Sequence, residues 1–242
     1  MKKYGLIGKK LTHSFSAGYF ENKFERENLP EYSYELFEIP DIHDIEKIFR
    51  QEVSGFNVTI PYKTAIIPYL DELDESARKV GAVNVVKIDG PRKIGYNSDY
   101  TGFRESLETW LREIPDQALV LGTGGASRAV VTVLNDLGIR PVLVSRSEGE
   151  GRITYRDLDE VLIRNSSLIV NSTPLGTFPD IDQAPDIPYH LLTPDHYLYD
   201  LVYNPEVTLF MQYGLNHGAA VKNGLEMLHI QAERSWEIWN DK

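Results

Sequence analysis

Residues 117–138, which read QALVLGTGGASRAVVTVLNDLG, constrain the fold of this chain more than any other segment. The apolar run 118–121 predicts a short buried strand that leads into a glycine-rich turn. A helix is expected next, and Gly138 is a typical stop for it. The apolar face of this helix comprises Val130, Val133, Leu134 and Leu137. A strand, a glycine turn and a helix in this order predict a unit of a parallel α/β sheet.

The first hundred residues also alternate between short strands and helices. Strands are predicted over 4–8, 32–39 and 53–60, and helices over 13–29 and 41–50. This β-α-β-α-β order predicts a mostly parallel sheet with helices packed on its faces. A hairpin is expected to follow, with its turn at Asp89-Gly90-Pro91.

The same alternation restarts near Asp99. Further strands are predicted over 140–146, 168–176 and 197–203, after the strand at 118–121. The closing segment predicts a helix with one apolar stripe, which comprises Leu225, Leu228, Ala232, Trp236 and Trp239. We therefore predict an α/β protein of two lobes that meet near residue 100.

Composition limits the classes of ligand. The formal net charge is −11 and the pI is about 5.0, so nucleic acid and anionic lipid are not expected as partners, and a small molecule is. No cysteine is present, and the six histidines form no ligand-spaced cluster, so no metal is expected. The start of the chain does not resemble a signal peptide, and no stretch approaches the roughly 20 apolar residues of a membrane span. We expect a cytoplasmic protein.

The glycine turn has a defined task in a Rossmann unit. Gly122 allows the sharp turn from strand to helix, and Gly124 lets the backbone approach a pyrophosphate at the helix N-terminus. Ser127 stands where a third glycine is usual, so the motif is weak outside this context. The alternative is a tight turn that binds nothing.

The end of the next predicted strand bears on the choice of cofactor. An acidic residue there would bind a ribose 2′-hydroxyl, but this chain has Ser145-Arg146-Ser147. An arginine flanked by hydroxyl groups suits a 2′-phosphate, which favours NADP over NAD. The alternative for Arg146 is a solvated surface charge.

Polar residues follow the strand ends of the first lobe. The segment GFNVTIPYK reads as a strand that Pro61 ends, and Lys63 follows on a stiff loop. Asn84 and Asp99 also follow strand ends, where open α/β sheets bind ligands. Each has a simpler alternative: Asn84, Asn97 and Asp99 could form Asx turns, and a serine of the pair Ser14 and Ser16 could cap a helix.

These motifs together resemble the shikimate dehydrogenase family. The resemblance runs over nearly the whole chain, through HSFS, NVTIPYK, GAVN, NSDYTGF, VLGTGGASRA, NSTPLG, DLVYNP and NGLEMLHIQA. It implies a substrate-binding domain of residues 1–99 and 224–242, and a Rossmann-like NADP-binding domain of residues 100–223. The implied reaction is the reversible reduction of 3-dehydroshikimate to shikimate by NADPH, in aromatic amino-acid biosynthesis.

The resemblance also implies roles for individual residues. Lys63 and Asp99 would act at the reacting oxygen. The substrate-binding residues would be Ser14, Ser16 and Tyr203 at the carboxylate and Thr59, Asn84 and Gln231 at the ring hydroxyls. The cofactor-binding residues would be Gly122, Gly124, Gly125, Ala126, Ser127, Ser145, Arg146, Ser147, Thr173 and Gly224. For Tyr203 the alternative is a core aromatic, and for Gln231 it is an exposed amide.

Lysine is chemically suited to this role. Hydride arriving at a carbonyl leaves negative charge on oxygen, and a cation with a transferable proton stabilises and quenches that charge.

Several positions depart from the family pattern. Ala17 replaces a usual proline, Thr177 stands where a methionine near the nicotinamide is common, and Arg152 is the only candidate for a second arginine at the cofactor end.

Alternative functions are a relative that acts on quinate or uses NAD, and a non-catalytic protein of the same fold that senses its ligand. A monomer or a homodimer is expected.

Overall fold

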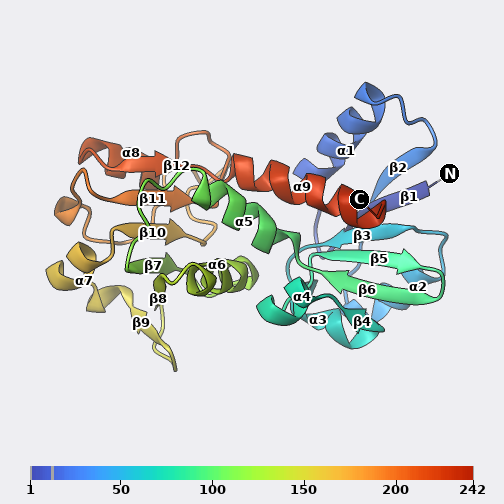
Figure 1. The fold of residues 1–242 in the computed structure, drawn as a ribbon, viewed down its shortest axis with the longest axis horizontal. Helices are drawn as coiled ribbons and strands as arrows, with labels where there is room; N and C mark the ends of the chain where they lie inside the picture. Colours follow the sequence, from blue (N-terminus) through green and yellow to red (C-terminus); the bar gives the residue numbers. More distant parts are fainter. Residues whose placement is uncertain (1, 12–13, 242) are drawn as a thin grey trace. The chain divides into compact units, whose positions relative to one another are not determined.

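The computed structural model describes residues 2–11 and 14–241. The chain forms two compact units, which Figure 1 shows: unit 1 is Met1–Thr101 with Gln231–Lys242, and unit 2 is Gly102–Ile230. The chain leaves unit 1 within α5 (Ser98–Glu108) and returns to it within α9 (Leu225–Trp239). These changeovers lie two and seven residues beyond the boundaries predicted after residues 99 and 223.

Unit 1 contains a mixed sheet in the order β2-β1-β3-β5-β6-β4. Its strands are β1 (Lys2–Gly8), β2 (Tyr32–Glu38), β3 (Gly55–Val58), β4 (Glu72–Leu73), β5 (Val85–Asp89) and β6 (Arg92–Tyr96). The strands β2, β1 and β3 are parallel, whereas β5 runs antiparallel to both β3 and β6. The predicted hairpin is confirmed, because β5 and β6 flank Gly90, whose φ is 58°.

Alternation along the strands supplies a separate core to each face of this sheet. Tyr4 and Leu6 of β1 pack with the aromatic residues of α1 (Phe15–Arg26) and α9, whereas Ile7 packs on the opposite face. The opposite core includes residues of α2 (Ile45–Phe49), α3 (Tyr62–Ala65) and α4 (Glu75–Val80). Trp239 stacks on Tyr4 with ring centroids 4.5 Å apart, so the last turn of α9 is part of the core of unit 1.

Unit 2 contains a parallel sheet in the order β12-β11-β10-β7-β8-β9. Its strands are β7 (Gln117–Leu121), β8 (Arg140–Ser145), β9 (Arg152–Thr154), β10 (Leu168–Asn171), β11 (Tyr197–Asp200) and β12 (Ala220–Lys222). The order reverses between β7 and β10, as it does in a Rossmann fold, and ligands bind such sheets at this switch point. The predicted Rossmann-like architecture is confirmed.

Helices α6 (Gly125–Asp136), α7 (Glu160–Asn165) and α8 (Leu209–Asn216) belong to unit 2. Of the predicted face of α6, Val130, Val133 and Leu134 are fully buried, whereas Leu137 is partly exposed and caps the C-terminus of the helix. Fully burying an aliphatic side chain of this kind stabilises the fold by roughly 1.5–3 kcal/mol. Gly138 ends the helix with φ 77°.

The sequence analysis missed β4, β9, β12, α3, α5, α7 and α8. The three strands have two or three residues each, and helices α3, α7 and α8 have four, six and eight, which is too short for a hydrophobic period to be distinguished from chance. Helix α5 has eleven residues, all of them described, but its buried apolar side chains are only Phe103 and Leu107.

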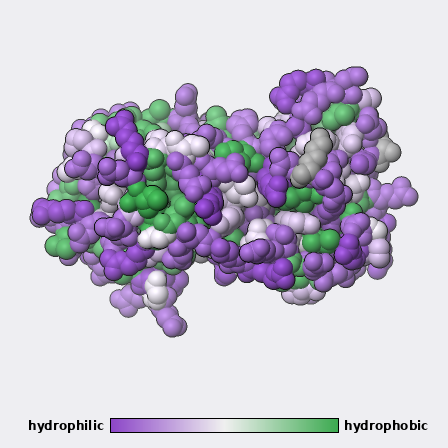
Figure 2. Space-filling view, in the orientation of Figure 1, coloured by the Kyte–Doolittle hydropathy of each residue, from purple (hydrophilic) through white to green (hydrophobic). Residues whose placement is uncertain are grey.

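Figure 2 shows that hydrophilic side chains cover most of the visible face, as the net charge of −11 leads one to expect. Over residues 2–11 and 14–241, no helix has the length and apolar character needed to cross a bilayer.

Candidate active site

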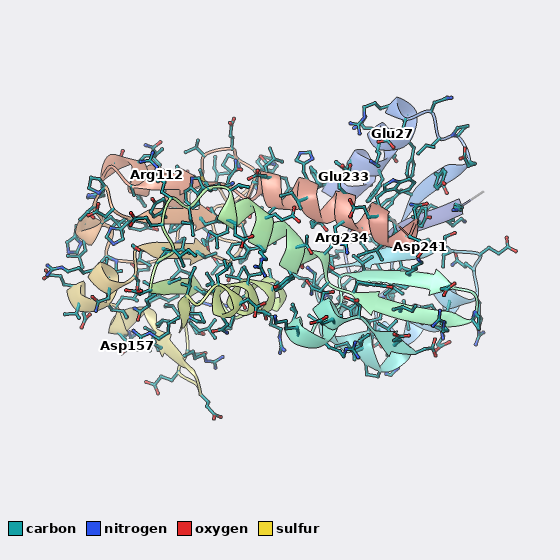
Figure 3. The ribbon with its side chains drawn as sticks, viewed as in Figure 1. Glu27, Arg112, Asp157, Glu233, Arg234 and Asp241 are labelled. Carbon is teal, nitrogen blue, oxygen red and sulfur yellow. The ribbon has the colours of Figure 1, made fainter. Side chains whose placement is uncertain are left out.

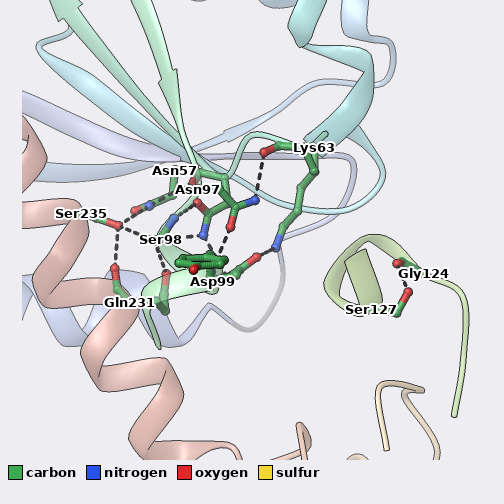
Figure 4. A network of polar contacts seen from close by, with 12 residues as sticks. Asn57, Lys63, Asn97, Ser98, Asp99, Gly124, Ser127, Gln231 and Ser235 are labelled. Carbon is green, nitrogen blue, oxygen red and sulfur yellow. Dashed lines mark hydrogen bonds and ion pairs between the residues drawn. The ribbon is translucent and has the colours of Figure 1, made fainter. Parts of the chain in front are cut away.

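Lys63 and Asp99 form an ion pair in unit 1. The Lys63 Nζ lies 2.5 Å from the Asp99 Oδ2, and the two side chains are 15% and 10% exposed (Figure 4). Lys63 lies in the short helix α3, not on the loop that the sequence predicts, because the turn after β3 ends at Pro61 and a helix begins at Tyr62. The Val83 N–H donates to the Lys63 carbonyl over 2.7 Å, which fixes the backbone of the lysine.

Asn84 holds the other oxygen of Asp99. Its Nδ2 donates to the Asp99 Oδ1 over 2.9 Å and to the Ser98 Oγ over 3.0 Å, while its Oδ1 accepts from the Ser98 N–H over 2.7 Å. Both amide protons of Asn84 are therefore used within the protein, so this side chain can bind a further hydroxyl group only as an acceptor. Asp99 receives an ammonium on one oxygen and an amide on the other, which fixes its orientation.

Gln231 approaches the same cluster from α9. It is 8% exposed, and its Oε1 accepts from the Ser98 hydroxyl over 3.4 Å.

An ion pair joins α9 to α1. The Nζ of buried Lys23 in α1 lies 2.8 Å from the Glu233 Oε2 in α9, and it also contacts Glu27. Figure 3 labels these two glutamates on their helices.

Ser14, Ser16 and Thr59 belong to other elements of unit 1 than Lys63 and Asp99. Ser14 caps α1, since its hydroxyl accepts from the Ala17 N–H over 3.3 Å, as the simpler alternative proposes. Burial raises the pKa of the Tyr34 hydroxyl, and the Ser16 side chain partly offsets this shift. Thr59 directly follows β3, and its N–H donates to the Ile7 carbonyl over 2.9 Å.

The glycine turn of unit 2 lies at the switch point of its sheet. Gly122 has φ 105°, which L-residues rarely adopt, and a Cβ there would lie 2.9 Å from the Thr173 methyl. The ends of β7 and β10 therefore approach closely at these two residues. Asn171 fixes the second of them, because its Oδ1 accepts from the Thr173 hydroxyl over 2.6 Å.

Helix α6 begins directly after this turn. Its N-cap is Gly124, and within residues 2–11 and 14–241 no side chain caps the first turn, which includes Gly125 and Ala126. A Cβ on Gly124 would meet no atom within 4 Å, so open space adjoins the helix N-terminus. The Ser127 hydroxyl donates to the Gly124 carbonyl over 2.6 Å and is thus turned back onto the turn itself. This arrangement can receive a phosphate group.

The residues after β8 form the second part of the predicted cofactor site. Ser145 is 9% exposed and its hydroxyl accepts from the Ser147 N–H over 3.4 Å, whereas Arg146 is exposed. The Arg152 guanidinium donates to the Glu148 carbonyl over 3.0 Å, so it braces the loop after β8.

Comparison with known proteins decides the family. Residues 6–86 match the family model described as the shikimate dehydrogenase substrate binding domain. The chain is 38% identical to the shikimate dehydrogenase (NADP(+)) of Clostridium beijerinckii, over 100% of this chain and 93% of that protein. The chain belongs to the shikimate dehydrogenase family.

Solved structures of similar fold include a family member from Thermus thermophilus in complex with NADP(H) and shikimate. It matches with a TM-score of 0.88 and 30% identity, over 100% of this chain and 94% of that one. A quinate dehydrogenase from Corynebacterium glutamicum in complex with NAD matches with the same TM-score and 25% identity, over 100% of this chain and 94% of that one.

The remaining residues predicted from the shikimate dehydrogenase pattern lie in unit 2. Gly224 precedes α9, and a Cβ there would lie 2.3 Å from the Leu201 carbonyl oxygen, so only glycine allows this approach of two backbone segments. Tyr203 follows β11, and burial raises the pKa of its hydroxyl.

The sequence analysis missed four buried polar residues of unit 1: Tyr34, Asn57, Ser98 and Ser235. Asn57 gave a signal, because it is a polar residue in the middle of an apolar strand. Ser235 lies one helical turn beyond Gln231, on the same side of α9. Among the described residues, no group of three or more His, Asp or Glu side chains could hold a metal ion.

Proposed function

We propose that this chain is an NADP-dependent shikimate dehydrogenase, which reversibly reduces 3-dehydroshikimate to shikimate. Family membership over the full chain supports the reaction, and the ion pair of Lys63 and Asp99 is the observation that carries it. In this proposal unit 1 binds the substrate and unit 2 binds NADP. The protein is expected in aromatic amino-acid biosynthesis, and its cytoplasmic location and monomeric or homodimeric state stay predictions.

The proposed chemistry divides between the cofactor and the residues of unit 1. NADPH, when bound, supplies the hydride. Lys63 donates a proton to the substrate oxygen on which negative charge develops, and Asp99 holds the ammonium in position. In the reverse direction the neutral amine of Lys63 accepts the hydroxyl proton.

Several residues of unit 1 are proposed to orient the substrate. Asn84 accepts from a ring hydroxyl, since both its protons are used by Ser98 and Asp99. Gln231 and Thr59 contact ring hydroxyls, and Ser14 and Ser16 bind the carboxylate. The carboxylate role of Tyr203, a residue of unit 2, stays a prediction.

The residues of unit 2 fit the proposed cofactor. The uncapped N-terminus of α6 and the open space at Gly124 suit the pyrophosphate, with Gly122, Gly125, Ala126, Ser127, Thr173 and Gly224 shaping the surrounding backbone. Arg146 with Ser145 and Ser147 suits the 2′-phosphate.

Absorbance of the reduced nicotinamide tests this proposal directly. Shikimate with NADP is expected to give turnover, and replacement of NADP by NAD is expected to lower kcat/KM. Turnover with quinate and NAD alone would assign the quinate dehydrogenase alternative. Binding of shikimate without turnover of either cofactor would assign the ligand sensor.

A further inference from the structure

Asn57 lies at the centre of a buried hydrogen-bond network in unit 1. Its Oδ1 accepts from the Tyr34 hydroxyl over 2.8 Å, and its Nδ2 donates to the Ser235 hydroxyl over 2.9 Å and to the Asn84 carbonyl over 3.3 Å. Figure 4 shows Asn57 of β3 beside Ser235 of α9, and the bond to the Asn84 carbonyl joins β3 to the turn before β5. Asn57 is 6% exposed and begins the segment NVTIPYK, in which the sequence analysis assigned roles to Thr59 and Lys63 but none to Asn57.

The network continues from Asn57 to residues of the proposed site. The Ser235 hydroxyl donates to the Gln231 carbonyl over 2.8 Å and lies 3.3 Å from the Ser98 hydroxyl. Ser98 contacts the side chains of both Asn84 and Gln231. On the other side, the Tyr34 hydroxyl gives its only proton to Asn57.

The donors of this network have a fixed order, which sets the orientation of each amide. The Asn84 carbonyl oxygen can only accept, so the Nδ2 of Asn57 must face it and the Oδ1 must face Tyr34. The Ser98 hydroxyl similarly turns the Oε1 of Gln231 inward, which sets the orientation of that amide.

We propose that Asn57 is a positioning residue for the reaction. It does not contact the reacting atoms. It sets the placement of Asn84, and through Ser235 that of Gln231, so that both hold fixed hydrogen-bond roles toward the substrate. This inference rests on the proposed function.

Three variants test it. Asn57→Ala removes the centre of the network and is expected to lower kcat/KM for shikimate about 100-fold, because small misplacements of binding groups carry large penalties. Asn57→Asp keeps an acceptor for Tyr34 but removes both donated bonds, so it is expected to be as impaired as Asn57→Ala. Tyr34→Phe removes one bond and is expected to lower kcat/KM about tenfold.

The control is Tyr189→Phe, which removes one partly buried tyrosine hydrogen bond of unit 2, to the Pro185 carbonyl. The thermal midpoint of Tyr189→Phe is expected to fall as much as that of Tyr34→Phe, with kcat/KM unchanged. If Tyr34→Phe and Asn57→Asp fold and retain the kcat/KM of the control, the positioning role is wrong.

Calorimetric titration with shikimate separates this inference from the proposed function. Weaker binding by Asn57→Asp supports positioning even if the wild-type protein turns over neither cofactor, a result that would refute only the dehydrogenase. Unchanged shikimate affinity and unchanged kcat in Asn57→Asp would overturn the positioning role.

Discussion

The candidate site of unit 1 consists of side chains, whereas that of unit 2 consists largely of backbone. In unit 1, Lys63, Asn84, Asp99 and Gln231 come from three helices and a turn, and buried hydrogen bonds hold them together. In unit 2, Gly122 and Gly124 shape one continuous turn at the switch point of the sheet. Proton transfer needs particular functional groups, but phosphate binding needs only oriented N–H groups.

The two units also treat a buried carboxylate differently. Asp99 is paired with the ammonium of Lys63, whereas the donors that the structure gives Asp200 are neutral. These donors are the Asn171 amide, the Val202 N–H and the Thr208 hydroxyl. Unit 1 therefore contains an ion pair that can transfer a proton. In unit 2 the hydrogen bonds of Asp200 hold the loops after β10 and β11 in place.

Lys63→Ala is expected to have the largest effect. Loss of the proton donor should lower kcat about 1,000-fold, or about 4 kcal/mol, with little change in the KM for shikimate. Steady-state kinetics would measure both constants. The control is Lys47→Ala, which removes an exposed lysine of unit 1. A raised KM with unchanged kcat would mean that Lys63 only binds the substrate.

The pH dependence of unfolding tests Asp200, the buried carboxylate of unit 2 that accepts hydrogen bonds from neutral donors. Burial raises the pKa of Asp200 from 3.8 to about 6, so its contribution to stability is full below about pH 4 and is lost as the pH rises through 6. The free energy of unfolding of Asp200→Asn, relative to wild type, should therefore rise by about 3 kcal/mol between pH 4 and pH 7.

Asp157→Asn provides the control for that experiment. Hydrogen bonds from the Thr154 backbone and hydroxyl lower the pKa of exposed Asp157, so the opposite trend is expected. Parallel pH profiles for Asp200→Asn and wild type would show that Asp200 titrates normally.

Gly122→Ala tests whether backbone geometry makes the site of unit 2. The Cβ would meet Thr173 and Ser172, and the positive φ adds strain, so we expect a loss of about 2 kcal/mol in NADP binding. Gly138→Ala is the control, because its φ is also positive but its Cβ would meet open space. Fluorescence titration with NADPH should separate the two variants, and equal affinities would contradict the importance of the close approach.

Arg146→Ala should have the smallest effect. Loss of one charged donor is expected to raise the KM for NADP about tenfold and to leave the KM for NAD unchanged. Arg164→Ala removes an exposed arginine of the same unit and serves as the control. An equal change in the KM for NADP and for NAD would mean that Arg146 does not contact the 2′-phosphate.

The contrast between a site made of side chains and a site made of backbone also explains what could be predicted from the sequence. The glycine turn is local, so Gly122, Gly124 and the face of α6 followed from spacing alone. The link between Lys63 and Asp99 needed the family pattern, because 36 residues separate the pair. Asn57 and Ser235 are 178 residues apart, and only the folded chain brings them into contact.

Local competition explains the remaining differences. Lys63 lies in a helix that begins at Tyr62, directly after Pro61. Strand periodicity predicts where β3 ends, but it gives no information about a helix of four residues that follows. Ser14 caps α1, which is the simpler role that any serine before a helix can take.

The central claim is that Lys63 and Asp99 act as one unit, and a double-mutant cycle on kcat tests it most directly. Lys63→Ala, Asp99→Asn and the double variant would be compared with wild type in the oxidation of shikimate by NADP. We predict that the double variant is about as slow as Lys63→Ala alone. If the fold-losses in kcat of the two single variants multiply in the double variant, Lys63 and Asp99 act independently. That result would contradict the proposed proton transfer by the pair.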